Sequence, residues 1–141
     1  MFVIHNFMSL TKLISLLLFW ISNNTNYDIS KFDYKVKIVD KEVIEEIVCN
    51  GKCPIVAYFG PEQGVLLSKG DLDDACFQSI LLHEIVHALQ FKSKKKIEYS
   101  FKELEAYSLQ QKFLEDYSKK NDLLTLLNLK SCRSNQHNTL F

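Results

Sequence analysis

The chain has 141 residues, of which 47% are hydrophobic and 12% aromatic, so it is long enough for one folded domain with its own core. Its 17 basic and 17 acidic side chains give a formal net charge of zero. The chain therefore has no excess positive charge, and nothing in its overall charge favours binding to nucleic acid or to an anionic membrane surface.

The N-terminus is the most apolar part of the chain. A nine-residue apolar core, residues 13–21, contains one serine, follows Lys12 and precedes a polar segment. This pattern is typical of a signal peptide, although residues 2–21 reach the length of a membrane span if Asn6 and Lys12 are tolerated. We therefore expect residues 1–26 to be a signal peptide or an uncleaved membrane anchor. The single domain of residues 27–141 would then be exported, either periplasmic or secreted.

The first half of this domain has the pattern of strands around one helix. Residues 34–39 alternate as in a strand, and residues 41–49 have apolar residues at helical spacing. Residues 55–59 and 65–67 are β-rich and flank a Gly- and Pro-containing turn, which predicts a hairpin. This hairpin is expected to pack on the helices that follow.

The four cysteines form an even set, which an oxidising compartment would allow to pair. Three connectivities are possible. An Asn-Gly turn between Cys49 and Cys53 favours a small local loop, which leaves Cys76 and Cys132 for a longer link. The alternative makes Cys49 and Cys53 metal ligands or a redox pair.

The segment ILLHEIVHALQF, residues 80–91, predicts a buried helix that carries an H-E-x-x-H motif. His83 and His87 lie one turn apart on one face, so both imidazoles can bind a single metal ion. Glu84 lies next to that face, where it can polarise a metal-bound water. These polar groups would be costly in so apolar a helix without a metal, and we therefore predict a catalytic zinc site.

A catalytic zinc ion keeps three protein ligands, so the two histidines need a partner. A second long helix is predicted at residues 100–119, and it offers Glu103 and Glu105. On a helical wheel Glu103 falls on the apolar face, whereas Glu105 points towards the side that carries Lys102. We predict Glu103 as the third ligand, with Glu105 as the alternative. A short helix at residues 122–129 and a polar tail from Ser131 complete the chain.

These motifs resemble those of zincin metallopeptidases of the gluzincin type, in which a Glu from a following helix joins H-E-x-x-H. Glu103-x-x-Ala106-Tyr107 is similar to their E-x-x-A-D motif, with Tyr107 in place of the Asp that orients a ligand histidine. Gln90, one turn after His87, is the candidate to replace that Asp. The resemblance covers residues 49–117 and extends to small exported bacterial metallopeptidases.

The resemblance implies an α+β zincin-like fold: a short antiparallel sheet or hairpin packed on the motif helix and on a second, ligand-bearing helix. It implies Zn2+-dependent hydrolysis of a peptide or protein substrate, with Glu84 as general base. An edge strand, either residues 55–59 or residues 65–67, would align the peptide, and Tyr99 or Tyr107 would stabilise the developing charge on the substrate oxygen.

Two other functions fit the same residues. An exported zincin-like module could bind a partner without cleaving it, although Glu84 would then have no task. A structural zinc site could be closed by a fourth ligand such as His137 or a cysteine.

Overall fold

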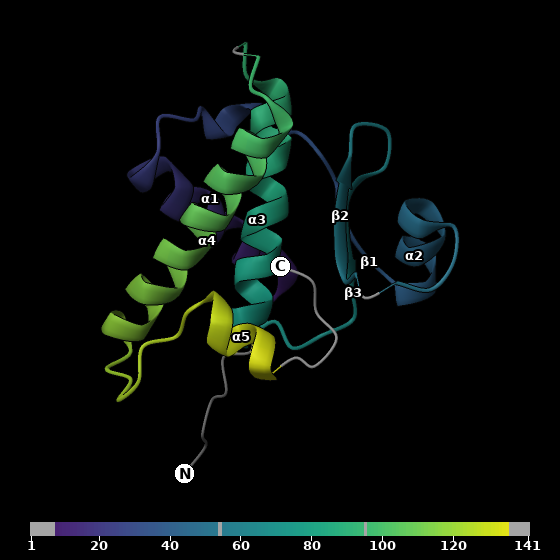
Figure 1. Cartoon of the computed structure of the whole chain (residues 1–141). Helices are drawn as coiled ribbons and strands as arrows, with labels where there is room; N and C mark the ends of the chain where they lie inside the picture. The colour runs from purple at the N-terminus through teal and green to yellow at the C-terminus, as the bar shows by residue number, and fades with distance from the viewer. Residues whose placement is uncertain (1–7, 54, 95, 136–141) are drawn as a thin grey trace.

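The computed structural model describes residues 8–53, 55–94 and 96–135, and its helices and its sheet confirm the α+β class (Figure 1). The elements of the described residues follow one another as α1 (Leu10–Asn24), the 3-10 helix η1 (Ile29–Lys31), β1 (Val36–Val39), α2 (Lys41–Cys49), β2 (Ala57–Gly60), β3 (Gly64–Ser68), α3 (Ala75–Lys92), α4 (Tyr99–Lys120) and α5 (Leu129–Asn135). The helix predicted at residues 41–49 is confirmed as α2, and the two long helices are α3 and α4.

The three strands form a mixed sheet in the order β1-β3-β2. The predicted hairpin is confirmed, since β2 and β3 pair antiparallel with Ala57 opposite Leu67. β1 pairs parallel to β3, with Val36 opposite Val65, so the sheet is mixed, and of the two predicted forms, an antiparallel sheet or a hairpin, the structure contains the hairpin. The reason is that α2 packs over the sheet and carries the chain from β1 to the hairpin, which leaves β2 as an edge strand in the described part of the chain.

α3 is the central element, and it lies between α4 and the sheet (Figure 1). Fourteen of its 18 residues are buried, because other elements cover it on several sides. The helix begins where the Asp74 side chain accepts a hydrogen bond from the backbone N–H of Phe77, at 3.1 Å. A helix held in this way provides a rigid base for side chains that face a site.

The apolar N-terminal run forms α1, which packs into the same core as α3 and α4. Leu13, Leu17 and Ile21 are at most 1% exposed, and the Trp20 indole N–H donates to Asp116 of α4 at 3.0 Å. No helix among the described residues is both long and apolar enough to span a membrane. This packing gives residues 10–24 a structural place in the domain, and the signal peptide stays a prediction.

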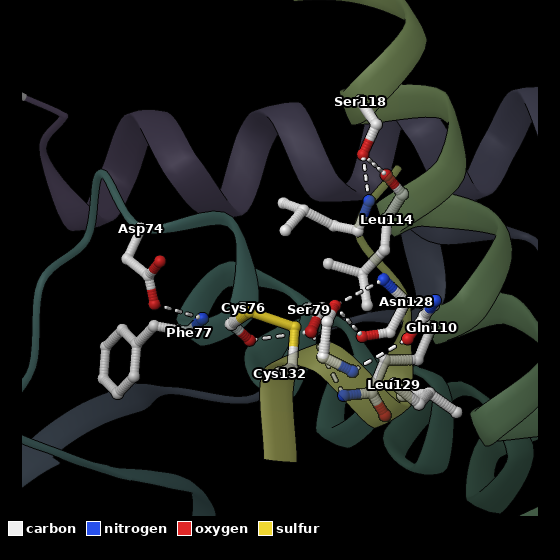
Figure 2. Close-up of a disulfide and its surroundings, with 12 residues drawn as sticks. Asp74, Cys76, Phe77, Ser79, Gln110, Leu114, Ser118, Asn128, Leu129 and Cys132 are labelled. Atoms are coloured by element: carbon white, nitrogen blue, oxygen red, sulfur yellow. Dashed lines mark hydrogen bonds between the residues drawn. A yellow bond between two sulfur atoms is a disulfide. The ribbon is translucent and has the colours of Figure 1, made fainter. Parts of the chain in front are cut away.

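Two disulfides confirm the predicted pairing of the cysteines. Cys49 and Cys53 close a loop at the end of α2, where Asn50 takes a left-handed conformation with φ of 51°. The second disulfide joins Cys76 in the first turn of α3 to Cys132 in α5 (Figure 2). All four sulfurs are paired, so the interpretation of the cysteines as zinc ligands is wrong.

The C-terminal part differs from the sequence prediction. Residues 122–128 are not helical, and α5 spans residues predicted to be a polar tail. Asn128 starts α5, because its side chain accepts from the Ser131 N–H at 2.8 Å while the Ser131 hydroxyl accepts from the Asn128 N–H at 2.9 Å. This reciprocal capping outweighs the apolar periodicity of the residues before it.

Candidate metal centre

His83 and His87 meet on the face of α3 that is turned towards α4. Their Nε2 atoms lie 3.0 Å apart, and their ring centroids are separated by 4.6 Å. His83 is buried and His87 is partly buried. The i, i+4 spacing therefore brings both imidazoles to a single point, as the sequence predicts.

Glu103 of α4 reaches the same point from the opposite helix. Its Oε2 lies 3.6 Å from His83 Nε2, and its Oε1 is in direct contact with His87 Nε2. The candidate ligand atoms of these three residues all lie within 4.8 Å of one another, so they could hold one metal ion. In a tetrahedral zinc site, neighbouring nitrogen and oxygen ligands are about 3.3 Å apart, which is close to this arrangement.

The alternative third ligand, Glu105, does not belong to this group. Two residues further along α4, its carboxylate turns away from Glu103 and accepts from the Gln90 side-chain N–H at 3.0 Å. It also accepts the hydroxyl proton of Tyr27. Glu105 is thus a hydrogen-bond acceptor behind the histidines, and the group that could hold a metal contains Glu103, the first choice, and not the alternative Glu105.

Gln90 holds His87, as the sequence predicts. Its amide nitrogen donates both protons, one to the backbone carbonyl of Lys102 at 2.9 Å and one to Glu105 at 3.0 Å. Its amide oxygen is then the atom that faces His87 Nδ1, at 2.8 Å. His87 must therefore carry its proton on Nδ1 to donate it, which leaves the lone pair of Nε2 directed at Glu103.

A second series of hydrogen bonds holds His83, and it also ends with a glutamine oxygen that faces the histidine Nδ1. The Ser79 hydroxyl donates to the Cys76 carbonyl at 2.7 Å and accepts from the Gln110 amide nitrogen at 3.1 Å. The Gln110 oxygen then accepts from His83 Nδ1 at 2.9 Å. Figure 2 shows Ser79 and Gln110 beside the Cys76–Cys132 disulfide.

Sequence analysis assigned no role to Gln110 or Ser79. The available signal was that Gln110 lies two turns after Glu103, so it is a buried polar residue on the same face of α4. A buried polar side chain on an apolar face needs a hydrogen-bond partner. That signal identifies Gln110 as a candidate but does not name the atom that it holds.

The three ligand groups require a positive charge among them. Two imidazole lone pairs and a carboxylate at these distances repel one another unless a proton or a metal ion lies between them. Burial alone would lower the pKa of His83, but the neighbouring carboxylates of Glu103 and Glu84 outweigh it and raise this pKa. The proximity of His83 is also the largest cause that lowers the pKa of Glu103. Two neutral imidazoles and a carboxylate are a donor set that suits zinc.

A cavity of about 510 Å³ opens beside the three ligands. Glu84 lies on its wall, and burial raises the pKa of this carboxyl group while the two histidines oppose that effect. β2 contributes the opposite wall, with Ala57, Tyr58 and Phe59. The general base and the edge strand predicted from the sequence therefore lie on the same cavity as the candidate ligands.

The two predicted tyrosines also line this cavity. The Tyr107 ring packs on His83, with 4.5 Å between centroids, and Tyr99 is 78% exposed. Their role as hydrogen-bond donors to a substrate stays a prediction. The other candidate, His137 as a fourth ligand, lies outside the described residues.

Comparison with known proteins gives one result. No curated protein and no solved structure matches the chain significantly. One family model matches residues 7–137, a region that includes α1 and the two helices that carry the candidate ligands. The chain therefore belongs to the family described as "Domain of unknown function (DUF6647)".

Proposed function

We propose that the protein is a zinc-dependent peptidase of the zincin type. The observation that carries this proposal is the convergence of His83 Nε2, His87 Nε2 and the Glu103 carboxylate on the wall of a cavity that also contains Glu84. Among the described residues, no fourth His, Cys, Asp or Glu joins this group, which suits a catalytic site that keeps one position open more than a structural site with four protein ligands. When bound here, zinc would supply Lewis acidity to a water molecule and to the substrate carbonyl.

Glu84 is the group that would move the proton. It takes a proton from the attacking water and passes it to the leaving amine. Burial raises its pKa and so brings it closer to the pH at which the enzyme would work. Tyr107 and Tyr99 both line the cavity, and the hydroxyl of one of them would donate to the developing oxyanion.

β2 would hold the substrate. It is an edge strand that lines the cavity, so its outer backbone groups can pair with an extended peptide. Apolar side chains such as Ile55, Phe59 and Phe91 surround this edge and suit an apolar residue of that peptide. The substrate class is therefore an extended peptide or an unfolded segment of a protein.

We also infer that the protein works outside the cytoplasm, in the periplasm or as a secreted protein. Two disulfides with no unpaired cysteine are typical of proteins from oxidising compartments. A segment at residues 1–26 would supply the route, and because α1 packs into the core of the domain, we expect this segment to stay on the chain.

The test combines metal analysis with peptide cleavage. We expect one zinc ion per chain, which His83→Ala and Glu103→Ala lose. Glu84→Gln should keep the zinc and the fold but lower cleavage of a peptide library at least a hundredfold, because general-base catalysis contributes about 10²–10⁴. The matched control is Glu46→Gln on the exposed face of α2, which should change neither property.

The outcomes separate the candidate functions. Full zinc occupancy without cleavage of any peptide would refute the proposal that the protein is a peptidase. The two remaining hypotheses would then be a binding module and a structural zinc site. Cleavage by Glu84→Gln at the wild-type rate would remove Glu84 from the mechanism. Wild-type protein that takes up no zinc would refute the metal site itself.

A further inference from the structure

Tyr27 and Glu105 form a second layer of contacts behind the histidines. Tyr27 lies between α1 and η1, and its hydroxyl donates to Glu105, a residue 78 positions later in α4. The same carboxylate oxygen accepts from the amide of Gln90, which holds His87. Three side chains therefore connect the N-terminal part of the chain to a candidate metal ligand.

We propose that Glu105 and Tyr27 are positioning residues for His87, and that they act by fixing the orientation of the Gln90 amide. This inference rests on the proposed zinc site. The oxygen and nitrogen of a glutamine amide are nearly equal in shape, so a rotation of 180° would turn its N–H groups towards His87. His87 Nδ1 would then have to accept, its proton would move to Nε2, and the nitrogen that faces Glu103 could no longer bind a metal.

Glu105 prevents this rotation because an ionised carboxylate only accepts hydrogen bonds. The amide oxygen of Gln90 cannot face it without repulsion, so the amide nitrogen must. The Lys102 carbonyl imposes the same orientation, but as a neutral acceptor it does so more weakly than a carboxylate. Glu105 therefore contributes more than the Lys102 carbonyl to the orientation of the Gln90 amide.

Tyr27 fixes Glu105 in turn. Burial and then the hydrogen bond to Glu105 raise the pKa of Tyr27, so its hydroxyl keeps its proton and remains a donor. Glu105 is itself only partly exposed and would lose solvation without gain if it had no donors. With both Tyr27 and Gln90 donating to it, the carboxylate has a single favourable orientation.

The test measures zinc affinity in competition with a chromophoric chelator. Glu105→Ala should weaken binding about tenfold, the lower end of the range for groups that orient metal ligands. Tyr27→Phe should weaken it a few-fold, and the double variant should be no weaker than Glu105→Ala, because Tyr27 acts through Glu105. The matched control is Asp116→Ala, which breaks the Trp20 contact between α1 and α4 but touches neither histidine.

A second measurement reports the imidazole directly. Long-range ¹H–¹⁵N NMR spectra of the metal-free protein, at a pH where the imidazoles are neutral, should show His87 protonated on Nδ1. Glu105→Ala should produce a fraction of the Nε2-protonated form. A merely structural role for Glu105 would lower the thermal stability without changing this tautomer.

Two results would overturn the proposal. The first is wild-type zinc affinity, within twofold, in both Glu105→Ala and Tyr27→Phe. The second is a loss in Asp116→Ala as large as that in Glu105→Ala. Wild-type protein without any zinc would instead refute the proposed function, and the NMR tautomer of His87 would still decide whether Glu105 orients it.

Discussion

The disulfide between α3 and α5 should contribute more to stability than the disulfide at the end of α2. Cys76 and Cys132 are 56 positions apart, whereas Cys49 and Cys53 are four apart. If disulfides act by restricting the unfolded chain, removing the long link costs about 4 kcal/mol and removing the short one about 2 kcal/mol. The expected difference between the two losses is therefore about 2 kcal/mol.

The measurement is equilibrium unfolding in urea of Cys76→Ala/Cys132→Ala and of Cys49→Ala/Cys53→Ala. Alanine keeps each buried position apolar, so the long-link variant leaves only a small void. It also keeps the Cys76 carbonyl, which accepts from Ser79, so zinc affinity should stay within twofold of the wild type. Equal losses in the two variants, or a larger loss for the short loop, would refute the chain-entropy reasoning.

Two further predictions concern α1 and the ligands. Leu17→Ala should lower the free energy of unfolding by about 3 kcal/mol, because this side chain is buried in the shared core. Phe19→Ala, on the exposed face of α1, should change it by less than about 0.5 kcal/mol, and equal effects in urea titrations would contradict the packing of α1. Zinc affinity should fall as the pH is lowered, because protons compete with zinc for His83. The fall should begin at a pH above 6.5, the ordinary pKa of histidine, because the pKa of His83 is raised. A dissociation constant that is unchanged between about pH 8 and pH 6 would contradict this expectation.

The elements with local periodicity could be predicted from the sequence. The motif helix and α4 have clear periodic patterns, and the helical wheel separated Glu103 from Glu105 because two positions on a helix differ by 200°. The structure brings Glu103, and not Glu105, to the two histidines. The site could be predicted to this extent because each inference used residues within one helix.

Features that depend on distant contacts could not be predicted. The parallel pairing of β1 has no local signal, since an alternating strand fits either direction. The apolar composition of residues 13–21 fits a signal peptide, a membrane segment and a core helix equally well. Only the packing of the segment distinguishes these three. The contact between Tyr27 and Glu105 joins residues 78 positions apart. The start of α5 is different, because its Asn128-x-x-Ser131 cap is a local pattern that marks a helix start.

The fixed orientation of the Gln90 and Gln110 side-chain amides has a consequence for recognising related sequences. The motif can be extended to S-x3-H-E-x2-H-x2-Q on α3 and to E-x-E-x4-Q on α4, where each added position takes part in the hydrogen bonds that orient a histidine. A glutamate in place of Gln90 would set a second carboxylate against Glu105. We therefore expect sequences that share this arrangement to exchange these two positions together, which would distinguish them from sequences that contain H-E-x-x-H by chance.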